Sequence, residues 1–283
     1  MSRVKSVAYP YYISWFFAFL GLHIAVGLDC TFSDLLNSIF ELSFLDMAGF
    51  KVGYYANSVA WYLSALFMNI IIFAPIIEKF GTRYIQKVAP VVSVFLYGIL
   101  ALNSSFLFAP HTVMFGLIYK GMIRCAAGIN AGFFIYGLHK NAEFLCSLKK
   151  HVKLAHFIQI STFIITIGYL VAPSSPDAFR DYFCVIILFL LLTTTLCTDS
   201  VIERTLEKVP LVLRMGKFSI YIYFSQAIVY SQKERLHLWN LSNYYKIFVF
   251  VVLCFGAAFL VYGIELLCRK IINSLRRNKN GED

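Results

Sequence analysis

Asn57, Trp61 and Ser64 lie within a long apolar stretch, and their spacing places them on one face of a helix. In a membrane, a polar side chain is costly unless it finds a partner or a wet cavity. Trp61 alone is typical of the aromatic belt at a membrane interface. Because Asn57 and Ser64 share its face, the pattern favours an inward, polar wall that lines a substrate cavity.

A second stripe consists of Ser219, Tyr223 and Gln226, which also share one helical face. Such a stripe either lines a cavity or forms a hydrogen-bonded seam between two helices. The residues by themselves leave both interpretations open.

Arg124 is the most unusual candidate, because it lies with Lys120 inside an apolar run. Lys120 is close enough to the predicted outer end to extend its amine to the interface. Arg124 is deeper, and a cation at depth usually marks a functional or counter-ion position. Gly128 and Gly132 have the spacing that lets membrane helices pack closely, which would hold Arg124 towards the bundle interior. Arg124 is therefore the candidate electrostatic residue of a site.

The sequence has none of the common catalytic motifs. It contains no nucleophile elbow, no glycine-rich phosphate loop and no pair of metal-ligating residues at helical spacing. His23 and His156 are better interpreted as interfacial residues than as bases. The cysteines have no metal-type spacing, and we expect no metal. So far, the residues fit a transporter as well as an enzyme.

The elements that must position these residues are membrane helices. Of 283 residues, 59% are hydrophobic and only 14% are charged, too few to cover a soluble globule. Eight continuous apolar runs have the length of a spanning helix, at 9–28, 57–78, 86–104, 112–138, 154–173, 182–198, 214–232 and 245–268. Barrel strands would alternate instead. We predict an all-α, polytopic membrane helical bundle of about eight transmembrane helices, forming a single membrane domain over 1–283.

The net charge of +10 is explained by topology rather than by a nucleic-acid partner. Lysine and arginine gather in alternate loops, the pattern expected when both termini are cytoplasmic. The first outward loop is instead acidic, with Asp29, Asp34, Glu41 and Asp46. This pattern predicts a multi-pass protein of the inner or plasma membrane, with a basic cytoplasmic tail at 270–283.

Within that outward loop, Ser33 to Leu45 has apolar residues at helical spacing and polar residues on the other faces. The pattern predicts an amphipathic helix that lies at the outer interface or caps the mouth of a cavity. Packing on the membrane surface and a role in substrate binding both remain open.

Several of these segments resemble motifs of the acyltransferase 3 family, bacterial membrane enzymes that O-acylate surface carbohydrates. Asn57 to Phe67 resembles the family's n-x-x-x-W-Y-L-S-A segment. Arg3 to Tyr12 resembles its basic R-x-x-R-x-x-P-x-Y approach to the third helix. Gly121 to Gly137 resembles its R-x-x-x-x-x-x-x-G helix, and Gly216 to Gln226 its G-x-x-S-x-x-x-Y-x-x-H motif. The motifs occur in the family's order.

Three departures accompany this resemblance. Gln226 stands where the family usually has His, and Pro10 is displaced. Family members usually have about ten helices, of which the first carries an essential Arg and His. The chain resembles the C-terminal eight, so we expect it to lack the first two helices. No residue of this chain takes the role of that His.

The resemblance implies acyl transfer from an acyl-CoA, most simply acetyl-CoA, to a sugar hydroxyl on the outer side. A base would activate the hydroxyl, and Arg124 would neutralise the CoA phosphates or the developing oxyanion. Because that base is missing, we expect little activity from this chain alone. Three hypotheses remain: a truncated family member, a non-catalytic exporter of a glycan or lipid-linked precursor (or a partner subunit), and a complete enzyme with an unrecognised base.

Overall fold

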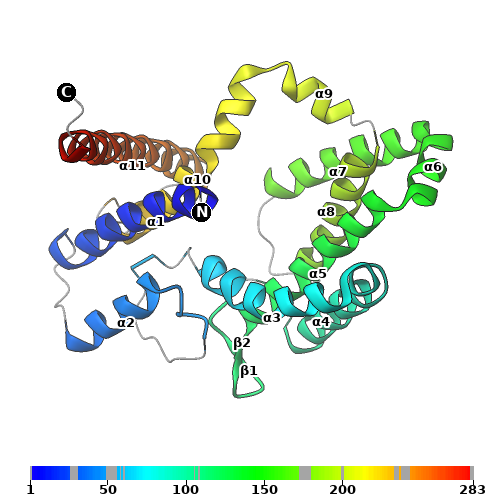
Figure 1. The fold of residues 1–283 in the computed structure, drawn as a ribbon, viewed down its shortest axis with the longest axis horizontal. Helices are drawn as coiled ribbons and strands as arrows, with labels where there is room; N and C mark the ends of the chain where they lie inside the picture. Colours follow the sequence, from blue (N-terminus) through cyan, green and yellow to red (C-terminus); the bar gives the residue numbers. More distant parts are fainter. Residues whose placement is uncertain are drawn as a thin grey trace. The chain divides into compact units, whose positions relative to one another are not determined.

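The structure is a computed structural model that describes residues 2–25, 31–48, 56–57, 59, 61–104, 106–107, 109–171, 180–198, 201–232, 236 and 243–280. Over these residues the chain is all-α apart from one short hairpin (Figure 1). It divides into two compact units. The first comprises Met1–Asp46, Phe50–Trp61 and Leu213–Asp283, and the second comprises Met47–Gly49 and Tyr62–Val212.

A helix overlaps each of the eight apolar runs. These helices are α1 (Ser2–Leu20), α3 (Trp61–Arg83), α4 (Ala89–Asn103), α5 (Lys120–Lys140), α7 (Val152–Val171), α8 (Arg180–Cys197), α10 (Pro210–Ser231) and α11 (Asn243–Asn280). Among the described residues, five stretches are long and apolar enough to cross a membrane: 61–103, 120–140, 152–169, 180–197 and 245–275. This is the make-up of a multi-pass membrane protein. Eight crossings remain a prediction, because α1 and α10 are not among the five and α3 and α4 fall in one stretch.

In the first unit, α1 continues into the short helix η1 (Gly21–Ala25), and α2 (Phe32–Leu42) runs back along α1 (Figure 1). Thr31 caps α2, because its hydroxyl accepts from the Asp34 backbone N–H and the Asp34 carboxylate accepts from the Thr31 backbone N–H. At the other end, the Tyr12 hydroxyl donates to the Leu42 carbonyl at 3.3 Å. The helix predicted within Ser33 to Leu45 is thereby confirmed.

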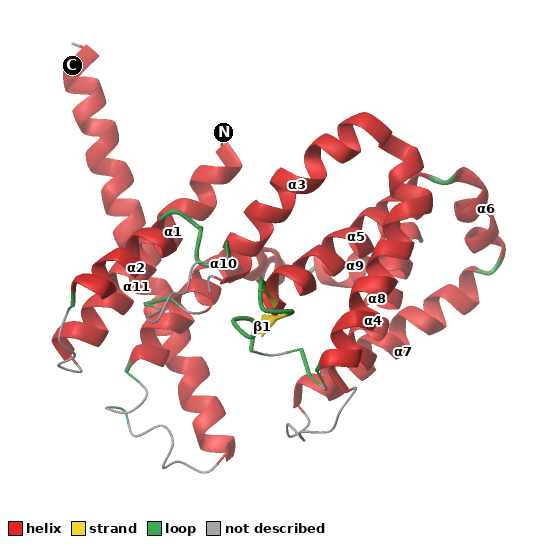
Figure 2. Cartoon of the chain, turned by 90° about the horizontal axis from the view of Figure 1, so that it is seen from below, coloured by secondary structure: helices red, strands yellow, loops and turns green. Residues whose placement is uncertain are grey.

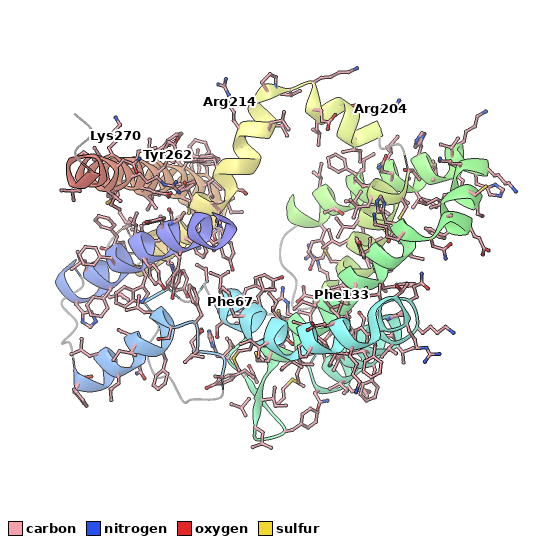
Figure 3. The ribbon with its side chains drawn as sticks, in the orientation of Figure 1. Phe67, Phe133, Arg204, Arg214, Tyr262 and Lys270 are labelled. Carbon is pink, nitrogen blue, oxygen red and sulfur yellow. The ribbon has the colours of Figure 1, made fainter. Side chains whose placement is uncertain are left out.

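The helices α10 and α11 of the first unit pack as an antiparallel pair. Val229 and Cys254 are buried together towards one end. Towards the other end, the rings of Tyr221 and Tyr262 meet edge to face at 5.2 Å. The start of α10 and the end of α11 therefore lie at the same end of the pair. Figure 3 labels Arg214 of α10 and Lys270 of α11.

The N-terminal part of α1 lies at that same basic end. The Arg269 guanidinium of α11 is 5.4 Å from the ring of Tyr9 of α1, and it bonds to the Glu265 carboxylate at 2.7 Å. Basic residues of α10 and α11 thus lie at the end of the pair beside the N-terminal part of α1. This grouping agrees with the charge pattern from which a cytoplasmic side is predicted, and the orientation itself stays a prediction.

The second unit packs α4 against α5 and α7 against α8 (Figure 1). Phe73 of α3, Tyr84 and Ala89 form a buried apolar cluster with Phe133 of α5, which Figure 3 labels. Gly81 has a φ of 47°, a conformation open mainly to glycine, and this kinks the end of α3 before α4 begins. Three short helices belong to the described part of the unit: η3 (Tyr84–Val88), α6 (Ala142–Lys150) and α9 (Val201–Glu207).

The helix α5 begins later than the apolar run 112–138 predicts. Strands β1 (Val113–Met114) and β2 (Ile118–Tyr119) pair as an antiparallel hairpin before it, and Figure 2 shows β1 in yellow. Phe115 and Gly116 form the turn with positive φ values of 55° and 71°. Because α5 starts at Lys120, Arg124 lies in its second turn. The prediction of a helix that begins near residue 112 is therefore wrong, and the depth of Arg124 in the membrane stays a prediction.

The close packing predicted at Gly128 and Gly132 is also not found. A Cβ added at Gly132 would meet no atom within 4 Å, and one at Gly128 would meet only the Tyr97 hydroxyl, at 3.7 Å. Both glycines are exposed in this structure. Arg124 is held by other contacts, described below.

Candidate functional site

The helix α2 turns its polar face to the protein and its apolar face outward. Asn37, Ser38 and Glu41 are buried. The outward face comprises Phe32, Leu35, Leu36 and Ile39, whose exposed fractions lie between 43% and 75%. A surface helix of a water-soluble protein has the opposite arrangement. The polar face of α2 therefore builds part of the interior of the first unit, with Glu41 at its centre.

Glu41 is held by contacts to two other segments. The Trp15 indole N–H of α1 donates to Glu41 Oε2 at 2.6 Å, and the Ala56 backbone N–H donates to the same oxygen at 3.1 Å. The Tyr11 hydroxyl donates to the Glu41 backbone carbonyl at 2.7 Å. The second carboxylate oxygen, Oε1, is buried without a hydrogen-bond partner. One oxygen is thus fixed and the other is available.

Burial raises the pKa of Glu41 from its ordinary 4.5 to about 7. Desolvation penalises the carboxylate, and the hydrogen bonds from Trp15 and Ala56 offset only part of that penalty. The negative charge of Asp46 raises the pKa further. Helix α2 lies outside the five candidate membrane spans. A carboxyl group with a pKa near 7 can take up and release a proton at neutral pH, as general acid–base chemistry requires.

Asn57 follows Ala56, whose backbone N–H bonds to this carboxylate, and is itself buried, with 3% of its surface exposed. Neither its amide oxygen nor its amide nitrogen has a hydrogen-bond partner. The segment that carries it is anchored on both sides, by the Ala56 N–H on Glu41 and by the Tyr223 hydroxyl of α10, which donates to the Val59 carbonyl. Two predicted site residues, Asn57 and Tyr223, are therefore grouped with Glu41 in one unit.

The other predicted residues of the first unit are placed differently. Trp61 and Gln226 are half-buried. Ser219 is exposed, and its hydroxyl donates to the Gly216 carbonyl of its own helix at 2.8 Å. A role for these three in lining a cavity stays a prediction.

Ser64 and Arg124 belong to the second unit. Ser64 is fully buried, and its hydroxyl accepts from the Met47 backbone N–H at 3.0 Å. Arg124 is half-buried and donates to the Leu107 carbonyl at 3.0 Å. Each side chain thereby fixes a loop to a helix, so the predicted site residues are divided between the two units.

The residues around Arg124 form a polar network at the start of α5. Lys120 is almost completely buried and donates to the Ser104 hydroxyl at 2.8 Å. The two carboxylate oxygens of Asp181 accept from the Leu107 backbone N–H and from the Tyr169 hydroxyl, both at 2.7 Å. This network ties the segment after α4 to α5, α7 and α8.

Reasoning from the sequence missed the importance of Glu41, which appeared only as one of four acids in the outward loop. A signal was available in the pattern of α2. A helix with a wide apolar face that borders lipid must turn its carboxylates inward, and Glu41 lies on the polar face. No group of three or more His, Cys, Asp and Glu side chains that could hold a metal ion occurs within the described part of the chain.

No family model, curated protein or solved structure matches the chain. The resemblance to the acyltransferase 3 family therefore rests on the sequence motifs alone, and the function has to be inferred from the chemistry of the site.

Proposed function

We propose that the protein is a membrane acyltransferase in which Glu41 is the general base. The proposal is carried by the unpartnered Glu41 Oε1 next to the segment that bears the unpartnered Asn57 amide. Buried polar atoms are normally hydrogen-bonded, so these atoms offer places for a polar ligand. A sugar hydroxyl fits both chemically, because it can donate to the carboxylate and accept from the amide.

In the proposed reaction, Glu41 Oε1 takes the proton of the sugar hydroxyl while the hydroxyl oxygen attacks the thioester carbonyl of an acyl-CoA. The new C–O bond forms as the C–S bond breaks. The leaving thiolate takes the proton from Glu41, which restores the carboxylate. The products are the O-acylated sugar and free CoA. A base with a pKa near the working pH performs both proton transfers efficiently.

Under this proposal, Asn57 positions the acceptor hydroxyl, and Trp15 and the Ala56 N–H keep the carboxylate in place. Arg124 contacts the segment after α4, which the charge pattern assigns to the outer side. Arg124 belongs to the second unit and is given no part in this reaction. Residence in the inner or plasma membrane with both termini cytoplasmic belongs to the same proposal.

A non-catalytic exporter of a glycan or lipid-linked precursor is the second candidate. The same atoms favour it, because an unpartnered carboxylate and amide can bind hydroxyls without reacting. A buried carboxyl group in a membrane protein can also couple transport to a proton.

Acetyl transfer by the protein in nanodiscs tests the first candidate. Radiolabelled acetyl-CoA and surface carbohydrate are supplied, and the labelled carbohydrate is counted. We expect Glu41→Gln to lower kcat at least about 100-fold, as loss of a general base does. The matched control Glu78→Gln changes an exposed carboxylate of α3 and should leave the rate unchanged.

The outcomes separate the candidates. Transfer that persists in Glu41→Gln contradicts the role of the base. Absence of transfer by the wild-type protein, together with carbohydrate binding that Glu41→Gln abolishes, favours the exporter.

A further inference from the structure

The carbonyl groups at the C-terminal end of α2 are hydrogen-bonded within the protein and do not require water. The last four carbonyls of an α-helix have no partner within the helix and are usually completed by solvent or a cap. In α2 all four have donors. The Ile39 carbonyl accepts from the Ser43 N–H at 3.0 Å and the Phe40 carbonyl from the Leu45 N–H at 2.8 Å. The Glu41 and Leu42 carbonyls accept from the hydroxyls of Tyr11 and Tyr12 of α1.

The beginning of α2 is different, because its cap is polar and exposed. Thr31 is exposed, and the Asp34 carboxylate that completes its cap has a lowered pKa owing to hydrogen bonds from Thr31. One end of the helix is therefore suited to the aqueous interface. The other end satisfies its backbone internally, as hydrocarbon demands of any backbone that it contacts.

The position of α2 along α1 agrees with this difference. Glu41 contacts Tyr11 and Trp15, which lie in the middle of α1 rather than at its end. Helix α1 is predicted to span the membrane, and a helix lying flat on the membrane surface would meet it only near one end.

The outward side chains are apolar along both helices. On α2 they are Phe32, Leu35, Leu36 and Ile39, and on α1 Tyr12 and Phe16 are 42% and 51% exposed beside them. A helix that borders lipid is expected to have apolar side chains on its outer face and its carboxylates turned towards the protein, as α2 does.

We infer that α2 is a re-entrant helix, which enters the membrane from the Thr31 end and packs its apolar face against lipid acyl chains alongside α1. The Glu41 side chain then points away from the acyl chains into the protein, where Tyr11 and Trp15 contact it. This inference depends on the burial and hydrogen bonds of α2, and it holds whether the site performs acyl transfer or transport.

Spin labels on α2 test the inference in nanodiscs. Single cysteines replace Phe32, Leu36 and Ile39, one at a time, in a background whose native cysteines are replaced and whose melting temperature matches the wild type. Accessibility to oxygen, which concentrates in hydrocarbon, is compared with accessibility to a water-soluble nickel chelate. We expect the ratio of oxygen to nickel accessibility to rise steadily from position 32 to position 39.

Two results would overturn the inference. Equal nickel accessibility at all three positions would place α2 flat at the interface or in water. Protection from both reagents would mean that protein, rather than lipid, covers the helix.

A second measurement does not depend on labelling. Tyr12→Phe keeps the ring but removes the donor to the Leu42 carbonyl, so the melting temperature should fall. The matched control Tyr136→Phe changes an exposed ring of α5 and should have no effect. Equal melting temperatures for the two variants would contradict a helix end buried away from water, because water would replace the lost donor.

Discussion

Several buried polar side chains of the second unit bond across the interfaces between helices, although the Thr193 hydroxyl has no partner. Among the described residues, more buried polar atoms lack a partner in the first unit. In the second unit, Asn130 accepts from the Tyr84 hydroxyl at 2.7 Å, and the Ser93 hydroxyl donates to the Ala127 carbonyl at 3.0 Å. In the first unit, Glu41 Oε1 and both amide atoms of Asn57 are buried without a hydrogen-bond partner.

The contrast extends along α1 and α10 of the first unit. Ser14 and Ser225 are completely buried, and neither hydroxyl has a partner. Hydrogen bonds between membrane helices stabilise a fold modestly, while a buried polar atom left unpaired costs free energy. The second unit therefore uses its polar residues to hold helices together. The first unit keeps polar atoms available at a cost in stability, which is typical of a site that binds something.

The largest expected effect is a dependence of stability on pH that comes from Glu41. Its pKa is raised in the folded protein to about 7 from 4.5, so the folded state binds the proton more tightly. The resulting stabilisation is complete below the unfolded pKa and is lost as the pH rises through about 7. The difference amounts to about 3 kcal/mol at most. Melting temperatures in detergent should fall between about pH 5 and pH 8 in the wild type, and much less in Glu41→Gln. An unchanged slope in the variant would assign the effect to another group.

A smaller loss is expected when the polar network of the second unit is broken. Asp181→Ala leaves the Leu107 N–H and the Tyr169 hydroxyl without their acceptor, which should cost about 2 kcal/mol of unfolding free energy. Asp181→Asn retains one acceptor oxygen and should cost less. Unfolding in increasing SDS measures both. If neither variant is destabilised, the network does not hold the unit together.

Two asparagine variants compare the units directly. Asn130→Ala removes the acceptor of the buried Tyr84 hydroxyl and should cost about 1 kcal/mol. Asn57→Ala removes a side chain without partners, so stability should stay the same or rise while carbohydrate binding weakens. Thermal unfolding and a binding titration check the pair. A greater loss of stability in Asn57→Ala than in Asn130→Ala would contradict the view that polar residues stabilise the second unit but not the first.

The smallest effects come from the two helix caps. Thr31 caps α2 in the first unit, and Asn141 caps α6 in the second, where its side chain accepts from the Phe144 N–H at 3.1 Å. Each alanine substitution should lower the melting temperature by about 2 °C. Only Thr31→Ala should also change the pH dependence, because α2 carries Glu41. If the melting temperatures of both variants depend on pH in the same way, the cap at Thr31 does not influence Glu41, and the prediction is contradicted.

Much of the secondary structure could be predicted from the sequence. Continuous apolar runs locate helices because a chain in lipid must satisfy its backbone internally, and each run overlaps a helix. The start of α5 was missed because apolar residues suit a helix and a strand alike. In the structure, Val113–Met114 and Ile118–Tyr119 form a hairpin with a turn at Phe115 and Gly116. The turn was hard to predict because a phenylalanine rarely adopts a positive φ.

The candidate site was predictable only in part. Asn57 and Tyr223 were selected by helical spacing, and both belong to the unit of Glu41. The helical position predicted for Asn57 is wrong, because α3 begins only at Trp61 and Asn57 lies in the turn before it. Spacing could not show that Arg124 lies in the second turn of α5, since that depends on where the helix begins.

The sequence by itself determined that the protein has the hydrophobic composition of a membrane protein, that its apolar segments are helical and that α2 is amphipathic. These properties follow from composition and local periodicity. Only the tertiary structure decided that the polar face of α2 points inward and that Trp15 and Ala56 meet on one oxygen of Glu41. The reason is that burial and partners depend on residues far away in the chain, so a carboxylate that looks like an ordinary loop acid can become the most perturbed acid of the site.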